Sequence, residues 1–321
     1  MVDAIRVEGL TKVYGELVAV DQVGFAVRAG ELFGLLGPNG AGKTTTIRML
    51  TGLTRPTSGS AMVAGQDVVK RPFQVKEHIG MLSDVASLYN EMNVWDNLTF
   101  VARLHGLHRN KRSERIGDLL DLFGLIDSKR QPVGTLSTGQ KKRLMIAAAL
   151  VHEPEVLFLD EPTTGLDVQS ARDLRSLMLE LHSRGVTIVL TTHYIQEAEQ
   201  LCQRVAIINQ GRIVTIDTPD HLKSLVQQEC FVQIAFDRPA DELRARLQSL
   251  DQVERVIISG SGARLYVKDI SEIVEPLIQA VTASGARVVS FNTNQPTLED
   301  AFVTLTGLHP EVMLADKAPD G

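Results

Sequence analysis

The sequence has few cysteines: only Cys202 and Cys230 occur among its 321 residues, and no Cys-x-x-Cys pair is present. A zinc ribbon or a disulfide framework is therefore not supported. No apolar run reaches the length of about 18 residues that a membrane-spanning helix needs. Residues 1–28 mix charged with apolar residues and lack the unbroken apolar core of a secretory signal. These absences favour a reducing, cytoplasmic setting.

The chain also lacks an excess of basic residues. Its 33 Lys and Arg face 39 Asp and Glu, which gives a net charge of −6. Proteins that grip phosphate backbones usually carry a basic surplus. The balance argues against nucleic acid as the main partner, and we expect none. The length allows one large domain and a smaller one.

Short apolar runs alternate with helical patterns over the first two thirds of the chain, which indicates an α/β fold. The expected strands lie at 4–8, 18–27, 31–36, 156–159 and 186–191, with a hairpin formed by 204–209 and 212–216. The expected helices lie at 43–53, 141–151, 168–184 and 194–203. Residues 91–150 are expected to be rich in helices, with apolar positions three and four apart.

The last third has a different order of elements. Strands are expected at 230–236, 253–258, 264–268 and 287–291, and helices at 241–250 and 271–283. This β-α-β-β-α-β order is that of a ferredoxin-like module. A last helix is expected at 298–306, and the polar residues 310–321 are expected to form a loose, disordered tail.

A glycine-rich turn follows the strand at 31–36 and opens the next helix. Its residues 37–44 fit the pattern G-x-x-x-x-G-K-[ST]. Glycines let backbone N–H groups curl around phosphates, and the start of a helix attracts the same anion. Lys43 adds a full positive charge, and the Thr44 hydroxyl is suited to bind Mg²⁺. The pattern predicts a MgATP site.

Two carboxylates, Asp160 and Glu161, end the apolar strand at 156–159. Such a strand is expected in the sheet centre, next to the strand that feeds the glycine turn. Alternation sends the two side chains in different directions. Asp160 can then hold Mg²⁺ through water, and Glu161 can act as general base on the attacking water.

Three further motifs occur in a fixed order: Leu136-Ser137-Thr138-Gly139-Gln140, Asp160-Glu161-Pro-Thr-Thr-Gly-Leu-Asp167, and Thr191-Thr192-His193. Together with the glycine turn they resemble the signature motif, the Walker B and D-loop, and the H-loop of ABC-transporter nucleotide-binding domains. The resemblance covers residues 3 to about 220. It implies a P-loop NTPase fold with a helical subdomain at about 84–150, inside an ATP-binding domain at 1–222 that precedes the small α+β domain at 223–309.

The resemblance also assigns roles to residues. ATP would be bound by Tyr14, stacked on the adenine, and by Gly37, Pro38, Asn39, Gly40, Ala41, Gly42, Lys43, Thr44 and Thr45. One chain has one phosphate loop and one signature loop, so ATP would lie between the two copies of a homodimer. Ser137, Thr138, Gly139 and Gln140 would then act in trans. His193 would contact the γ-phosphate in a catalytic role beside Glu161, and Asp167 would bridge the two sites.

The ending Pro296-Thr297-Leu298-Glu299-Asp300-Ala301-Phe302, followed by Leu305-Thr306-Gly307, resembles that of ABC-2-type exporter ATPases of the daunorubicin-resistance and sodium-efflux types. This similarity implies an ATPase that powers a separate integral-membrane permease from the cytoplasmic face of the cell membrane. The permease contact is expected between about 84 and 110. Tyr89, Met92, Val94 and Trp95 are either its apolar anchors or ordinary core. The cargo is not encoded in this chain, and residues 229–307 support the dimer or regulate it.

Three positions depart from the family pattern. Asp84 stands where a glutamine is usual, so it either reaches the Mg²⁺ shell through a water or is a loop carboxylate without metal contact. Thr138 replaces a glycine, and Ala148 replaces a common arginine, a change for which we find no mechanism. Two rival functions stay open at this point: a soluble ABC ATPase that acts on nucleic acid or ribosomes, and a non-catalytic nucleotide-sensing subunit.

Overall fold

The computed structural model describes residues 3–82, 88–226, 231–238, 243–294 and 297–308. It divides into two compact units, one formed by residues 3–219 with 305–308 and the other by Asp220–Thr304. The division falls close to the boundary predicted at 222. Asp84, Cys230 and the tail at 310–321 lie outside the described residues.

The first unit is built on a six-stranded sheet of order β10-β9-β3-β8-β7-β6. Its strands are β3 (Leu32–Leu36), β6 (Ile79–Leu82), β7 (Val156–Asp160), β8 (Thr187–Thr192), β9 (Arg204–Asn209) and β10 (Arg212–Asp217). All pairs except β9–β10 are parallel, and β3, β7 and β8 are buried along their whole length. Because parallel strands end at one edge of a sheet, loops far apart in the sequence meet there.

One prediction about this sheet is wrong. The strand that carries Asp160 was expected beside the strand that feeds the glycine turn, but β8 lies between β3 and β7. The order of strands along the chain does not reveal such an insertion, since β8 follows both of them in sequence. The consequence is that Thr191 and Thr192, at the end of β8, sit between the glycine turn and the carboxylates.

The same unit contains an antiparallel sheet of order β2-β1-β4-β5. It comprises β1 (Asp3–Tyr14), β2 (Leu17–Arg28), β4 (Ser58–Val63) and β5 (Gln66–Asp67). Its inner face joins the parallel sheet in one apolar core, where the rings of Phe25 and Phe33 stack 5.3 Å apart. The helices α1 (Lys43–Leu50) and α2 (Pro72–His78) belong to the same unit. The strands and helix between 58 and 82 were not predicted.

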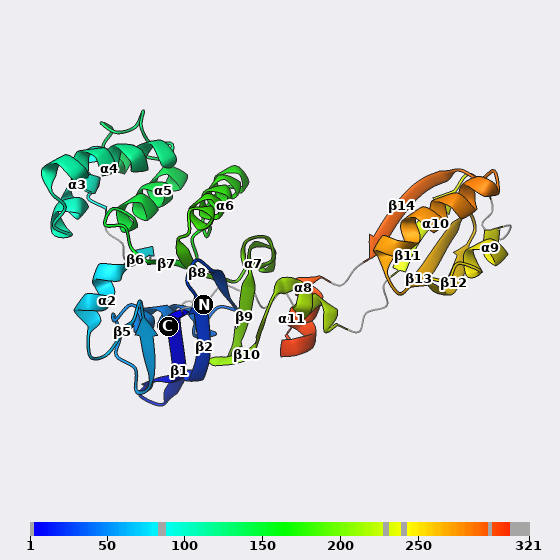
Figure 1. Cartoon of the computed structure of the whole chain (residues 1–321), viewed down its shortest axis with the longest axis horizontal. Helices are drawn as coiled ribbons and strands as arrows, with labels where there is room; N and C mark the ends of the chain where they lie inside the picture. The colour runs from blue at the N-terminus through cyan, green and yellow to red at the C-terminus, as the bar shows by residue number, and fades with distance from the viewer. Residues whose placement is uncertain (1–2, 83–87, 227–230, 239–242, 295–296, 309–321) are drawn as a thin grey trace, which may run out of the picture. The chain divides into compact units, whose positions relative to one another are not determined.

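The stretch predicted to be rich in helices contains α3 (Val94–Leu104), α4 (Arg109–Leu122), the short 3₁₀ helix η1 (Val133–Thr135) and α5 (Thr138–Ala149), and α3, α4 and α5 lie together (Figure 1). Of the four candidate anchors, Val94 is fully buried core, Tyr89 is 51% exposed, and Met92 and Trp95 are half-buried. Two further helices, α6 (Val168–Ser183) and α7 (Ile195–Leu201), follow β7 and β8.

The second unit has the predicted order of strands and helices. It contains β11 (Phe231–Phe236), α9 (Arg244–Gln248), β12 (Val253–Ser259), β13 (Gly262–Val267), α10 (Ile270–Ala283) and β14 (Val288–Asn294), preceded by α8 (Pro219–Ser224) and followed by α11 (Leu298–Thr306). The four strands form an antiparallel sheet of order β12-β13-β11-β14. Alternate residues of β11, namely Val232, Ile234 and Phe236, face its core. None of the helices in the described parts of either unit is long and apolar enough to cross a bilayer.

Candidate active site

The turn between β3 and α1 is held in a shape that only glycine permits. A Cβ on Gly37 would collide with the carbonyl oxygen of Ile208 on β9. Gly42 has φ +100, and a Cβ there would lie 2.6 Å from the carbonyl oxygen of Ala19. Because these clashes are with backbone atoms of neighbouring strands, the loop cannot relax around a side chain. The two glycines therefore allow the loop to pack directly against β9 and β2, and its other side stays open.

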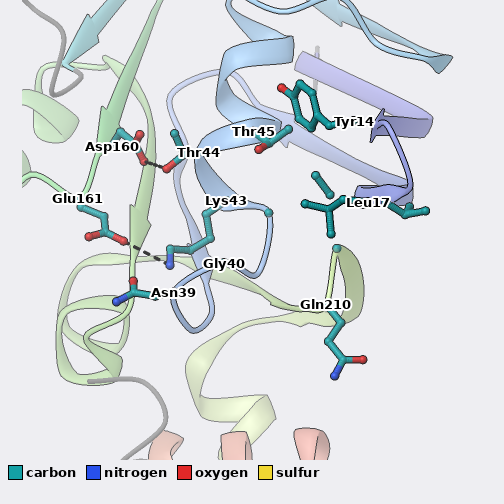
Figure 2. Close-up of a pocket in the computed structure, with 14 residues that line it drawn as sticks. Tyr14, Leu17, Asn39, Gly40, Lys43, Thr44, Thr45, Asp160, Glu161 and Gln210 are labelled. Carbon is teal, nitrogen blue, oxygen red and sulfur yellow. Dashed lines mark hydrogen bonds and ion pairs between the residues drawn. The ribbon is translucent and has the colours of Figure 1, made fainter. Parts of the chain in front are cut away.

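Lys43, the first residue of α1, points back into this loop. Its Nζ donates to the carbonyl oxygens of Gly37 at 2.7 Å and Pro38 at 3.1 Å. It also lies 3.3 Å from Oε1 of Glu161 (Figure 2). Only 4% of Lys43 is exposed, and this burial lowers the pKa of its ammonium group against the opposing effect of Glu161. The loop thus surrounds a buried cation that is aimed at the carboxylates.

Asp160 is the last residue of β7, and threonines bind it from two elements. Thr44 Oγ1 donates to Oδ1 at 3.1 Å from α1, and Thr191 Oγ1 donates to the same oxygen at 2.6 Å from the end of β8. A hydroxyl and a carboxylate this close are the hard oxygen donors that Mg²⁺ prefers. Thr191 was named only as part of the motif before His193, and its contact with Asp160 was not predicted, because that contact depends on the insertion of β8 between β3 and β7.

Glu161 follows Asp160 and points elsewhere, as alternation predicted. Its φ of +46° is unusual for a residue other than glycine, and its N–H donates to the backbone oxygen and the hydroxyl of Thr191 at 3.2 and 3.0 Å. Oε2 lies 3.2 Å from Nδ1 of His193, a distance in the ion-pair range. His193, and then Lys43, lower the pKa of Glu161 to about 2 against the effect of burial. The carboxylate is consequently ionised at neutral pH.

A cavity of about 950 Å³ opens above the loop. Figure 2 shows Tyr14 and Leu17 on one side of it and Lys43 and Glu161 on the other. Seven of the predicted ATP-binding residues line the cavity: Tyr14, Asn39, Gly40, Gly42, Lys43, Thr44 and Thr45. Gly37, Pro38 and Ala41, also in the loop, are buried and do not line the cavity. Tyr14 is 46% exposed, and the Nζ of Lys12 lies 4.8 Å from its ring centroid.

The sequence reasoning missed five lining residues: Leu17, Val18, Ala19, Gln210 and Gly211. The first three begin β2, where exposed apolar side chains extend the wall that Tyr14 starts; Leu17 is 66% exposed. Gln210 and Gly211 form the predicted turn of the β9–β10 hairpin. The unusual exposure of Leu17 and Val18 at a strand start has no signature in the sequence.

The signature residues do not line this cavity, and their helix starts earlier than predicted. Ser137 is the N-cap of α5: its hydroxyl accepts from the N–H of Gln140, and Gln140 Oε1 accepts from the N–H of Ser137. This capping box draws Thr138, Gly139 and Gln140 into the first helical turn, whereas the helix was predicted to begin at 141. The S-x-x-Q spacing was the overlooked signal.

Asp167 caps the next helix, α6. Its carboxylate accepts from the N–H and the hydroxyl of Ser170 at 2.9 and 2.6 Å, and these bonds lower the pKa of Asp167. A Cβ on Gly139 would lie 2.8 Å from Oγ of this same Ser170. The first turns of α5 and α6 therefore pack directly against each other, and this close packing explains why position 139 is a glycine.

These features define a P-loop nucleotide-binding domain: a glycine turn after a parallel strand, a buried lysine on the helix it opens, and carboxylates from a second parallel strand. The family described as ABC transporter matches residues 20–164. The chain is 37% identical to the daunorubicin/doxorubicin resistance ATP-binding protein DrrA of Streptomyces peucetius, over 96% of this chain and 93% of that one. It is 36% identical to the Nod factor export ATP-binding protein I of Cupriavidus metallidurans, over 96% and 98%.

Among solved structures, the cbiO1 subunit of the ABC transporter complex cbiONQ from Clostridium perfringens has a TM-score of 0.64 and 29% identity, covering 69% of this chain and 91% of that one. The chain belongs to the ABC transporter family, in which it is an ATP-binding subunit of the daunorubicin-resistance type. It is therefore an ATPase whose partner is a membrane permease, and the soluble alternative is set aside.

Proposed function

We propose that two copies of this chain close on two MgATP molecules and so drive export through a separate permease. The observation that carries this proposal is the convergence of Lys43, Asp160 and Glu161 at one end of the cavity, with Tyr14 at the other. A cavity of about 950 Å³ with a cationic end and an aromatic end suits a triphosphate that carries a planar base.

The residues present fit a magnesium nucleotide. Thr44 and Asp160 would supply the oxygen ligands, Asp160 through a water, since Mg²⁺ typically takes one or two carboxylates and completes its shell with phosphates and waters. The ion would neutralise charge on the transferred phosphate. The loop amides and Lys43 bind the phosphates, and Tyr14 stacks on the base.

Glu161 is the proposed general base. Its ionised carboxylate can accept a hydrogen bond from the attacking water and orient it, although a pKa of about 2 makes it a weak base in this arrangement. Lys43 is one of the two groups that hold this pKa low. When Lys43 turns to phosphate its charge is shared, so we expect the basicity of Glu161 to rise with nucleotide bound. His193 then contacts the γ-phosphate.

The signature residues are proposed to act on the partner's nucleotide. Ser137, Thr138, Gly139 and Gln140 lie outside the cavity of their own chain, at the start of a helix that can hold a phosphate. Asp167 lies at the neighbouring helix start and would bridge the two sites. Both predictions require a homodimer.

The permease contact is proposed for the region from 84 to 110, where Tyr89 is exposed and rests edge-on against Phe100 with ring centroids 5.1 Å apart. Such a contact would place the chain at the cytoplasmic face of the membrane. Relatives named for drug resistance and for Nod factor export support export as the direction. The cargo pocket is expected in the permease, and the small C-terminal unit would support or regulate the dimer.

The test is Glu161→Gln in the full chain. We expect ATP binding to persist, the nucleotide-bound dimer to accumulate in size-exclusion chromatography, and steady-state phosphate release to fall by about a hundredfold or more. Glu180→Gln, on the exposed face of α6, is the matched control and should hydrolyse normally. Turnover by Glu161→Gln at the wild-type rate would remove Glu161 from the role of base.

A further inference from the structure

Glu197, on α7, is a buried carboxylate that the mechanism above does not use. It is 1% exposed, and neither of its carboxylate oxygens makes a hydrogen bond of good geometry among the described residues. Burying such a group is costly unless it is partnered. A residue of this kind in the middle of a well-packed unit calls for a functional reason.

The polar groups nearest to Glu197 come from two segments that are distant in sequence. The hydroxyls of Thr163 and Thr192 lie beside its carboxyl group. Thr163 is two residues beyond Glu161, and Thr192 directly precedes His193. Glu197 therefore touches both of the segments that carry the Glu161–His193 pair.

The end of β8 shows how the two sides are connected. Thr191 points toward Asp160, to which it donates at 2.6 Å, and Thr192 points to the opposite side of the sheet, toward Glu197. The hydroxyl of Thr192 accepts from the N–H of Tyr194 at 3.0 Å, so its proton is available for a carboxyl oxygen. Adjacent threonines at one strand end thus face Asp160 on one side of the sheet and Glu197 of α7 on the other.

We propose that Glu197 is a positioning residue. From the far side of the sheet it would bind the hydroxyls of Thr163 and Thr192, and so hold Glu161 and His193 in the positions that hydrolysis requires. The proposal rests on the roles given above to Glu161 and His193. It explains why a carboxyl group is kept where an apolar residue would pack at lower cost.

The carboxyl group of Glu197 is suited to binding two hydroxyl groups. Burial raises the pKa of Glu197 against the opposing influence of the Thr192 and Thr163 hydroxyls, and of Arg175 on α6 and His193. A protonated carboxyl has one donor and an acceptor, which matches two hydroxyl groups that can each donate or accept. Glutamine has the same size and also offers both, whereas leucine offers neither.

The experiment compares Glu197→Leu and Glu197→Gln in the full chain, with Gln200→Leu, an exposed position of α7, as control. For Glu197→Leu we expect kcat to fall by about tenfold or more while the Kd for ATP stays within about twofold, because misplacement affects chemistry more than binding. Its Tm should equal or exceed that of wild type, since a buried polar group has been replaced by an apolar one. Glu197→Gln should keep kcat within about threefold, as its hydrogen-bonding groups are retained.

Three results would overturn the proposal: Glu197→Leu at the wild-type kcat, a loss of kcat that merely accompanies lower Tm and weaker ATP binding, or Glu197→Gln as slow as Glu197→Leu. If the leucine variant does not fold, Thr163→Val, which removes one of the two hydroxyls, decides instead; an unchanged kcat would count against the positioning role. Glu161→Gln is assayed in parallel. If it still turns over, the catalytic assignment is wrong; if it is inactive while Glu197→Leu is active, only the positioning role is wrong.

Discussion

Replacing Thr191 by valine tests the hydrogen bond between its hydroxyl and the carboxylate of Asp160. Valine keeps the shape of the side chain and removes the hydroxyl, which is fully buried and donates to Asp160 at 2.6 Å. A hydrogen bond to a charged group contributes about 1.5–3 kcal/mol. Asp160 keeps Thr44 as a donor, and the N–H of Glu161 keeps the backbone oxygen of Thr191 at 3.2 Å. Since no group is fully orphaned, we expect a loss of about 2 kcal/mol.

For a unit of this size, each kcal/mol lowers Tm by about 2–4 °C, so the expected shift is about 4–8 °C. The assay is thermal unfolding without nucleotide, followed by circular dichroism. Thr187→Val, on the same strand, is the control: Thr187 is also buried, but its hydroxyl accepts a neutral N–H bond from Gly30 at 2.9 Å. This variant should lose about 1 kcal/mol. A Thr191→Val protein that melts no lower than Thr187→Val would refute the charge-assisted contact.

Two further outcomes follow from the fold. Gly37→Ala should abolish soluble expression, because its Cβ meets the Ile208 carbonyl oxygen. A Cβ on Gly40 meets no protein atom in the described part of the chain, so Gly40→Ala should lower folding stability only by the strain of its positive φ, about 1–2 kcal/mol; equal losses of Tm in the two variants would contradict this contrast. Burial, and the neighbouring His105, lower the pKa of His152 from 6.5 to about 4. Between these pH values the unfolded chain binds more protons than the folded one, so the free energy of unfolding should rise from pH 4 to 6.5. Urea denaturation at pH 5 and 7 measures this rise, which should be smaller in His152→Gln.

Much of the site could be predicted because its chemistry is local. The glycine turn, Lys43 and Thr44 lie within one continuous pattern, and Asp160 with Glu161 directly follows a buried strand. The order of strands and helices in the C-terminal unit was also confirmed, since alternation and turn glycines mark it in the sequence. Its sheet order came only from the structure.

What could not be predicted depends on contacts between distant segments. The insertion of β8 between β3 and β7 decides that Thr191 reaches Asp160, and nothing near Thr191 in the sequence announces it. Likewise, Glu197 reads as one charged residue of a short helix until packing places it beside Thr163. The late start predicted for α5 has another cause: the capping box at Ser137 was present in the sequence and was not used.

The paired threonines at the end of β8 bear on how this chain can change over time. Since neighbouring residues of a strand face opposite ways, gaining or losing one residue within β8 would exchange the two hydroxyls between the faces. Asp160 and α7 would then lose their contacts at once. Genes encoding such chains should accordingly vary in length within surface turns such as the one at 260–262, while the span from Thr187 to His193 keeps a constant number of codons.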